Sequence, residues 1–261
     1  HGAGMTNSIQ ASVLSELERR HAQTITPMMF YVQPPSSGHD DGEKSMRSRS
    51  LLFLSLGVAV CSSLGANRPL VVAENGLISL NVPLTPSRMG SSSTRTTHPH
   101  FLSLFCDFVG SINGTVSIET PYRFCTKGEM LRNCQDQATL RATVQSTMSC
   151  SHPESGRFQG HSPGNHCGYC VPCIIRRASI HAASLPHSLY NIDVVATPPN
   201  PQSKMGRDLR AFRIALERLR EACSTRFLCD VLSTGPIPPP DASRYADVYR
   251  RGMMEVSTLL G

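Results

Sequence analysis

The sequence predicts an α/β protein in which helices flank a parallel sheet, followed by a small cysteine-rich subdomain. Two observations lead to this prediction. Helical apolar patterns alternate with short apolar runs along the first half of the chain, an order typical of a parallel sheet covered on both faces. Three closely spaced cysteines then follow a fourth in the second half. The 261 residues are 39% hydrophobic, which is enough to form a packed core.

The first half of the chain supplies the alternating elements. Ile9, Val13 and Leu17 share one helical face, and Gly65 is a residue suited to a helix C-terminus. The expected elements are a helix at 8–20, a buried strand at 26–32, a polar loop at 33–44, a helix at 47–64, and strands at 70–73 and 115–118, with helices at 101–109 and 127–133.

Residues 46–66 imitate a secretory signal peptide, with a basic start, an apolar stretch from Leu51 to Val60 and small residues after it. The segment is internal, and about ten apolar residues are too few to span a bilayer. We therefore predict a buried helix here. With neither a membrane span nor a secretory start, the chain is expected in the cytoplasm.

The net charge is +6, and the basic residues are spread out except near Arg47/Arg49 and Arg176/Arg177. A diffuse surplus is typical of a solvated surface, whereas a nucleic-acid footprint concentrates Lys and Arg on one face. The sequence therefore disfavours nucleic-acid binding. We expect an α/β domain at 1–148, a zinc subdomain at 149–196, and a Pro-rich linker with a helical segment at 197–261, whose apolar stripe runs from Leu209 to Cys223.

Polar residues follow the strand expected at 70–73. Glu74, Asn75 and Gly76 would lie beyond its carboxyl end, where open α/β sheets bind their ligands. The hydroxyl-rich loop at 91–99 carries Arg95 and His98, which suit a polar or anionic ligand. The alternative for this loop is an ordinary solvated connection.

The spacing Cys167-x-x-Cys170-x-x-Cys173 offers three thiols in overlapping C-x-x-C steps, and Cys150 can supply a fourth. Four thiolates close a tetrahedral zinc site and leave no position for water, so the metal would be structural. Two alternatives stay open: disulfides or an iron–sulfur cluster in place of zinc, and a nearby histidine in place of Cys150, namely His152, His161 or His166.

The cysteine motif with the following Arg176-Arg177-Ala178 resembles the zinc signature of the 7-cyano-7-deazaguanine synthase (QueC) family. Two further stretches match in the same order. Arg49-Ser50-x-x-Phe53-Leu54 looks like that family's arginine-led helix. Thr120-Pro121 with Thr126-Lys127-x-Glu129-Met130 looks like its lysine-bearing segment. The loop at 74–99 is closer to the QueC-like component of Qat anti-phage defence systems.

The resemblance implies a Rossmann-like fold of the ATP pyrophosphatase type. It implies a ligase that uses ATP with Mg²⁺ to adenylate a 7-deazaguanine carboxylate for attack by ammonia or another amine, within queuosine biosynthesis or antiviral defence. Lys127 would contact phosphate, and Arg49 and Ser50 the nucleotide. The substrate-binding candidates are Glu74, Asn75, Gly76, Arg95 and His98. A surface role for Lys127 and a helix-capping role for Arg49 are the alternatives.

The family's Ser-Gly-Gly-x-Asp-Ser phosphate loop does not occur in the sequence. Because the chain opens at His1 with Gly2-Ala3-Gly4, we expect it to be N-terminally truncated and inactive alone. The expected ligand is a 7-deazaguanine-type small molecule, and the candidate protein partners are a protein from the same defence operon and a second copy of the chain. The competing hypotheses are a catalytically silent zinc-containing binding subunit and a zinc-mediated nucleic-acid binder.

Overall fold

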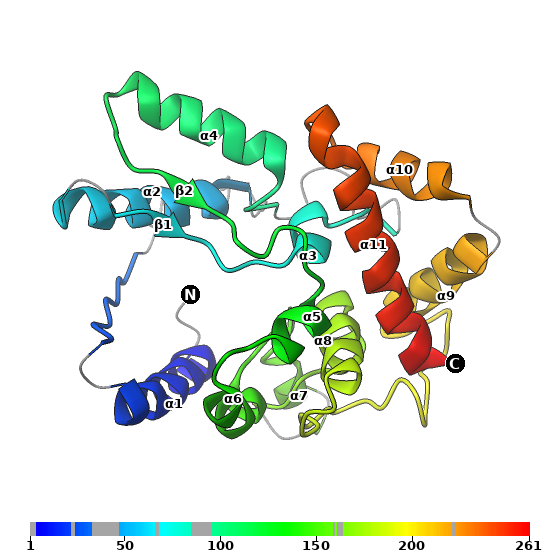
Figure 1. Cartoon of the computed structure of the whole chain (residues 1–261). Coiled ribbons are helices and arrows are strands. Elements are labelled where there is room, and N and C mark those ends of the chain that lie inside the picture. The colour runs from blue at the N-terminus through cyan, green and yellow to red at the C-terminus, as the bar shows by residue number, and fades with distance from the viewer. Residues whose placement is uncertain are drawn as a thin grey trace, which may run out of the picture. The chain divides into compact units, whose positions relative to one another are not determined.

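The computed structural model describes residues 4–21, 24–32, 47–65, 68–84, 95–158, 160, 164–220 and 223–261. Figure 1 labels its elements, which are α1 Gly4–His21, α2 Arg47–Ser63, β1 Leu70–Val71, α3 Gly76–Leu80, α4 Pro99–Ser111, β2 Ile118–Glu119, α5 Lys127–Arg132, α6 Gln137–Thr143, η2 Val144–Ser146, α7 Ser155–Phe158, α8 Val171–Ala182, α9 Arg207–Arg220, α10 Ser224–Leu232 and α11 Pro239–Leu260. The chain divides into two compact units: unit 1 comprises His1–Gly42, Leu131–Phe212 and Glu255–Gly261, and unit 2 comprises Glu43–Met130 and Arg213–Met254.

Unit 2 contains a small parallel sheet. β1 pairs with β2, with Leu70 opposite Ile118 and Val71 opposite Glu119. Leu54 of α2 and Phe105 of α4 belong to a buried apolar cluster against which Leu70 and Ile118 pack. Both helices lie beside the strands in Figure 1. The predicted parallel pairing and its helical neighbours are therefore present, in a molecule that is richer in helix than expected.

The buried strand predicted at 26–32 is wrong. These residues have no regular structure, and Met28 to Val32 are all exposed, Tyr31 by 83%. An apolar run becomes a buried strand only where another strand satisfies its backbone N–H and C=O groups. Among the described residues, the two-stranded sheet pairs β1 with β2 alone, so residues 26–32 have no strand beside them.

The helix predicted at 47–64 is present as α2, but the prediction that it is buried holds for one face only. Ser50 and Leu54 are buried, whereas Leu51, Leu52 and Phe53 are exposed, Phe53 by 44%. Its apolar residues go nearly all round the helix, but the unit covers a single face of it. None of the described helices combines the length and the apolar character needed to cross a membrane.

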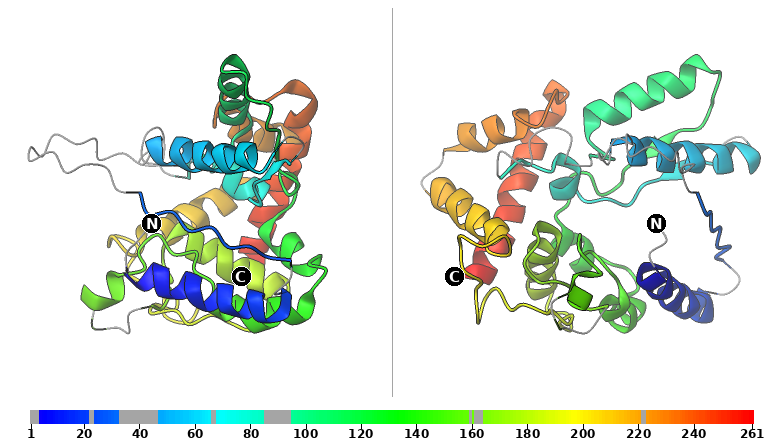
Figure 2. Two further views of the ribbon diagram at one scale, coloured as in Figure 1. Left: turned by 90° about the vertical axis from the view of Figure 1, so that its left-hand side faces the viewer. Right: turned by 180° about the vertical axis from the view of Figure 1, so that it is seen from behind.

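Unit 1 is built around α8. Ile180 of α8 is buried with Val144 and Leu185, and α1 packs against α6 and η2. Figures 1 and 2 show α1 beside α6 from opposite sides. The expected C-terminal stripe is present in α9, where Leu209 and Phe212 are buried. Cys223, predicted to continue that stripe, instead lies exposed after α9, at the N-cap position of α10. The loop predicted at 33–44 lies outside the described residues.

Candidate functional site

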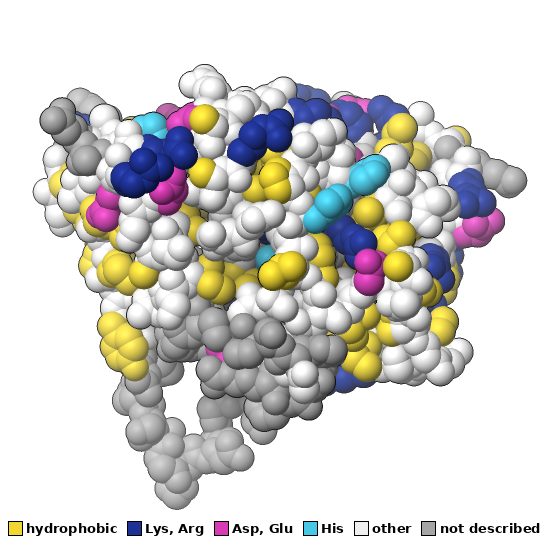
Figure 3. Space-filling model, turned by 90° about the horizontal axis from the view of Figure 1, so that it is seen from below, with side chains coloured by type: hydrophobic (Ala, Val, Ile, Leu, Met, Phe, Trp, Pro, Cys, Tyr) yellow, Lys and Arg dark blue, Asp and Glu magenta, His cyan; other side chains and the backbone are white. Residues whose placement is uncertain are grey.

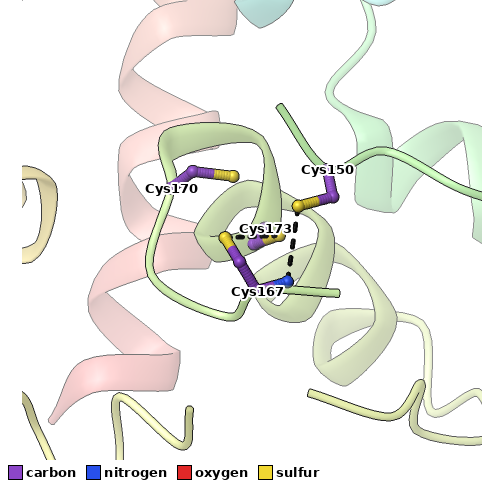
Figure 4. Close-up of side chains that lie close together, drawn as sticks. All are labelled: Cys150, Cys167, Cys170 and Cys173. Atoms are coloured by element: carbon purple, nitrogen blue, oxygen red, sulfur yellow. Dashed lines mark hydrogen bonds between the residues drawn. The ribbon is translucent and has the colours of Figure 1, made fainter. Parts of the chain in front are cut away.

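The four predicted cysteines of unit 1 come together. The sulfur atoms of Cys150, Cys167, Cys170 and Cys173 all lie within 4.8 Å of one another. Figure 4 shows them converging on one point, with Cys150 arriving on a separate segment. The Cys167 and Cys173 sulfurs are 3.8 Å apart. A tetrahedral site with Zn–S bonds of about 2.3 Å separates its sulfurs by about 3.8 Å. The four side chains therefore fit a single metal ion.

The loop before α8 has a conformation that only glycine allows easily. Gly168 has φ +89°, and a Cβ atom there would lie 2.0 Å from the Ile192 carbonyl oxygen. Two backbone hydrogen bonds hold these segments together. The Asn191 N–H donates to the His166 carbonyl at 2.8 Å, and the Ile192 N–H donates to the Cys167 carbonyl at 3.2 Å. This backbone pairing holds Cys167 in place from outside the cysteine motif.

The start of α8 places the other two cysteines of the motif. Cys170 is the N-cap residue in extended conformation, Pro172 lies in the first turn, and Cys173 follows within the helix. Proline is favoured at a helix start because its missing N–H is not needed there. The Val171 N–H donates to Asp208 Oδ2 at 3.2 Å, which satisfies one of the free donors of the first turn.

Backbone donors also meet the fourth sulfur. The N–H groups of His152 and Cys167 donate to Cys150 Sγ at 3.2 and 3.3 Å. Hydrogen bonds from Cys150, then from Cys167 and Cys173, hold the pKa of the Cys170 thiol well below its usual range. Hydrogen bonds with the neighbouring thiols, first with Cys150, instead raise the pKa values of Cys167 and Cys173. A thiolate is the form that binds a metal, so a bound cation would be needed to bring all four cysteines to that form.

The histidines that were alternatives to Cys150 differ in position. His166 Nδ1 lies 4.0 Å from Cys173 Sγ, and its Nε2 lies 3.2 Å from the Thr147 carbonyl oxygen. The ring of His152 stacks on Tyr169 with centroids 5.8 Å apart. Among the described residues, the group within ligating distance consists of cysteines alone. His161 lies outside the described residues.

In unit 2, residues 95–98 join several of the predicted substrate residues. Ser50 Oγ lies 2.8 Å from Thr96 Oγ1, and Thr97 Oγ1 donates to Glu74 Oε2. Arg95 Nη1 donates to the carbonyl oxygen of Thr234. Burial raises the pKa of Glu74. Residues 91–94 of the predicted loop lie outside the described residues, but its second half forms a buried polar strip.

His98 is buried within this strip and caps α4. Its Nδ1 accepts the His100 N–H at 3.3 Å, and its Nε2 lies 2.9 Å from Thr234 Oγ1. Thr234 Oγ1 in turn donates to the Val231 carbonyl at 2.6 Å. Burial, helped by the Arg95 charge, lowers the pKa of His98 to about 4. These contacts fit a neutral ring with its proton on Nε2.

Lys127 opens α5 next to a capping box. Thr126 Oγ1 accepts the Glu129 N–H at 3.1 Å, and Glu129 Oε2 accepts the Thr126 N–H at 2.8 Å. The Gly76 N–H donates to the Cys125 carbonyl at 3.0 Å. A Cβ atom on Gly76 would lie 2.2 Å from the Arg123 carbonyl oxygen. Glycine at 76 thus lets the lysine-bearing segment approach the start of α3.

The other two predicted residues of unit 2 mainly serve their own helices. Asn75 caps α3 by accepting the Ile78 N–H at 3.1 Å. The Arg49 guanidinium lies 5.9 Å from the centre of the Phe53 ring, one turn along α2. Arg49 is therefore near Ser50 in the sequence but makes a contact of its own. By contrast, residues 95–98 carry Arg95 and His98 and bond to Ser50 and Glu74 through Thr96 and Thr97.

Sequence reasoning missed Arg251 of α11. Its Nε donates to Glu129 Oε1 at 2.7 Å, and its Nη2 donates to the Phe124 carbonyl at 2.8 Å. Arg251 therefore contacts the segment that carries Lys127 on both sides of the lysine, at Phe124 before it and at Glu129 after it. The capping box could have been found from the Thr126-x-x-Glu129 pattern. Arg251 could not, since no local signal links residues 122 positions apart.

Basic side chains do not gather around one point on the face shown in Figure 3, where Lys and Arg stand in several separate groups with acidic ones among them. This distribution agrees with the diffuse charge expected from the sequence. The described basic side chains also form many local ion pairs, such as Arg226 with Asp230 at 3.2 Å.

The chain is similar to the 7-cyano-7-deazaguanine synthase of Novosphingobium aromaticivorans, with 28% identity over 144 residues. The match covers 53% of this chain and 52% of the synthase, so the chain spans about half the length of this curated relative. No protein-family model matches the chain, and no solved structure matches it. The similarity supports a relationship to the 7-cyano-7-deazaguanine synthase family.

Proposed function

We propose that this protein is a 7-cyano-7-deazaguanine synthase-like ligase, which uses ATP to adenylate a 7-deazaguanine carboxylate for attack by ammonia or another amine. The similarity to the synthase carries the proposal. A carboxylate is a poor acyl donor, so the reaction needs a leaving group and cations that hold the phosphates in line. Lys127, with Mg²⁺ bound to ATP, would supply that positive charge.

The buried polar strip of unit 2 suits the recognition of a purine-like ring. Asn75 uses its side-chain oxygen to cap α3, which leaves its amide N–H groups to donate to a ligand. Glu74 and Arg95 offer one acidic and one basic group, and His98 a neutral ring. In this proposal Arg49 and Ser50 face the nucleotide, and Gly76 lets backbone approach the substrate.

The metal centre is proposed to hold structural zinc. The 3.8 Å sulfur separation favours one ion over a disulfide, whose sulfurs lie about 2 Å apart. A zinc ion bound by all four cysteines would tie Cys150 to the loop before α8. Its four coordination positions would then all be filled, so none would be left for substrate. In this proposal residues 149–196 form the zinc subdomain, residues 1–148 bind nucleotide and substrate, and the Pro-rich segment and helices at 197–261 follow.

We further propose that the ligase acts in the cytoplasm, in the branch related to anti-phage defence. There the acceptor amine could belong to a protein partner. The sequence of the loop at 74–99 supports this branch. A second copy of the chain is an alternative partner.

Pyrophosphate release tests the proposal. The protein, expressed from its complete open reading frame, would be supplied with ATP, Mg²⁺ and 7-carboxy-7-deazaguanine. We expect Lys127→Ala to reduce pyrophosphate release by about 10²-fold, the typical cost of removing one group that stabilises transition-state charge. Lys204→Ala, at an exposed position, is the matched control and should release pyrophosphate normally. Absence of release from the unmodified protein would leave the silent zinc-containing binding subunit as the better hypothesis.

A further inference from the structure

Arg176 of α8 is buried in unit 1, where its guanidinium bonds to two separate segments of the chain. Its side chain donates five hydrogen bonds, although the residue is only 3% exposed. Nε and Nη2 donate to Ser188 Oγ at 3.1 and 2.9 Å. Nη1 donates to Thr147 Oγ1 at 2.8 Å and to Ser149 Oγ at 3.4 Å, and Nη2 also donates to the Val144 carbonyl. Every one of these acceptors is neutral.

A buried guanidinium without a nearby negative charge is costly, even when all its donors are satisfied. The neighbouring Arg177 shows the usual solution, since it forms two hydrogen bonds with the Asp193 carboxylate at 2.7 and 3.0 Å. None of the described carboxylates bonds to Arg176. Cys173, the last cysteine of the cluster, lies about one helical turn before it. Burial lowers the pKa of Arg176, and attraction first to Tyr190 and then to Cys173 opposes that effect.

A closed site supplies the missing charge. Four thiolates around one divalent cation carry a net negative charge, in an environment where Cys167, Cys170 and Cys173 are buried. A buried charge of one sign is stabilised strongly by a neighbouring charge of the other, because little water screens the pair. The metal-bound state therefore accounts for a cation at this position, whereas four neutral thiols do not.

The hydrogen bonds of Arg176 also reach the segment that brings Cys150 to the site. Val144, Thr147 and Ser149 lie on this segment, and the last of these contacts falls one residue before Cys150. The other three cysteines lie within seven residues of one another, so the local turn places them. Cys150 lies 17 residues before Cys167, outside the motif, so its position depends on the segment that carries it. His166 Nδ1 lies 4.0 Å from Cys173 Sγ, outside the group of ligand atoms that fits one ion, and would have to move to replace Cys150.

We propose that Arg176 is the positioning residue that selects Cys150 as the fourth metal ligand and balances the charge of the closed four-thiolate site. Arg176 bonds the Cys150 segment to the helix that carries Cys173. Without this connection the site would keep three thiolates and take a histidine or water in the fourth position. The inference rests on the metal centre of the proposed function but does not depend on the ligase chemistry.

The test uses the 261-residue protein loaded with Co²⁺, whose absorption reports the number of thiolate ligands. Arg176→Gln removes the positive charge. Arg176→Lys keeps the charge but loses the planar guanidinium that donates to several acceptors at once. Arg177→Gln, on the same helix, is the control. Metal-loaded samples are treated with iodoacetamide, and the modified cysteines are identified by mass spectrometry. In the unmodified protein and the control we expect Cys150, Cys167, Cys170 and Cys173 to be protected.

In Arg176→Gln and Arg176→Lys we expect Cys150 to be alkylated at least about 10-fold faster while the other three stay protected, with a Co²⁺ spectrum of fewer thiolates. Affinity for the metal, measured by chelator competition, should fall by about 10- to 100-fold, the usual effect of losing an outer-shell partner. Unchanged protection, spectrum and affinity in both variants would overturn the inference.

Thr147→Val provides the result if the arginine variants do not fold. This change removes one acceptor on the Cys150 segment and leaves the cation in place, so Cys150 should again react faster than the other three. Equal protection of all four would overturn the inference. Failure of the unmodified protein to bind Co²⁺ would instead reject the metal centre itself, and absence of pyrophosphate release would reject the ligase chemistry alone.

Discussion

Gly168 shows how one residue makes the four-cysteine cluster possible. Its positive φ turns the chain between Cys167 and Cys170, and its missing Cβ atom makes room for the Ile192 carbonyl. Any other residue would strain the turn and collide with backbone that cannot move aside. The C-x-x-C spacing therefore depends on glycine here for two reasons, only one of which is visible in the sequence.

His98 leads to a prediction about pH. Its pKa falls from the usual value to about 4 in the folded protein, so folding favours the neutral ring. Its stabilising contribution is present above pH 6.5 and is lost as the pH falls toward 4, because the unfolded chain then binds the proton that the folded chain excludes. The shift corresponds to about 3 kcal/mol.

Denaturant unfolding at pH 7 and pH 4 measures this effect. We expect the unmodified protein to be more stable than His98→Asn at pH 7 and to lose most of that advantage by pH 4. Asparagine can still cap α4, so the comparison isolates the titration. His187→Asn, at an exposed position, is the control and should show no such change. A stability difference that stays constant between the two pH values would contradict the assignment of a neutral His98.

The pairing of α11 with α5 is the element-scale feature that holds Lys127. Arg251 and Glu129 are joined at 2.7 Å, with about a quarter of each side chain exposed, and Glu129 also completes the capping box. Because the pair is partly shielded and shares a network, we expect a coupling energy of about 1 kcal/mol between Glu129→Gln and Arg251→Gln in a double-mutant cycle. Glutamine keeps the capping hydrogen bonds, so the cycle measures the charge interaction.

The exposed pair Arg220 and Glu217 of α9 is the matched comparison. It lies within one helix at 3.5 Å, and such pairs contribute about 0.2–0.5 kcal/mol. A coupling for Arg251 and Glu129 no larger than this would mean that α11 does not restrain the lysine-bearing segment through the ion pair.

At the scale of the whole molecule, the two compact units should respond differently to metal removal. The four-cysteine cluster and the residues that support it belong to unit 1. We expect a strong chelator to reduce hydrogen-exchange protection mainly at 144–192, because metal-binding energy there is folding energy. Protection of β1, β2 and α4 in unit 2 should persist, since their apolar cluster contains no metal ligand.

Hydrogen exchange with mass spectrometry, before and after chelation, would show this pattern. Cys167→Ser without chelator should reproduce it, whereas Cys106→Ser, at an exposed position in α4, should not. An equal loss of protection in both units would show that they unfold together.

The sequence by itself determined that Cys167, Cys170 and Cys173 lie together, because their short, fixed spacing is enforced by local backbone geometry, and it named Cys150 as the fourth member of the cluster. It also determined α1, α2, α4 and the parallel pairing of the strands near 70 and 118, where apolar periodicity is strong. It did not determine that residues 26–32 lack regular structure, since an apolar run says nothing about whether a neighbouring strand is available to pair with it. Only the tertiary structure brought Arg176 to the Cys150 segment, Thr234 to His98 and Arg251 to Glu129, because these contacts join residues that no local pattern relates.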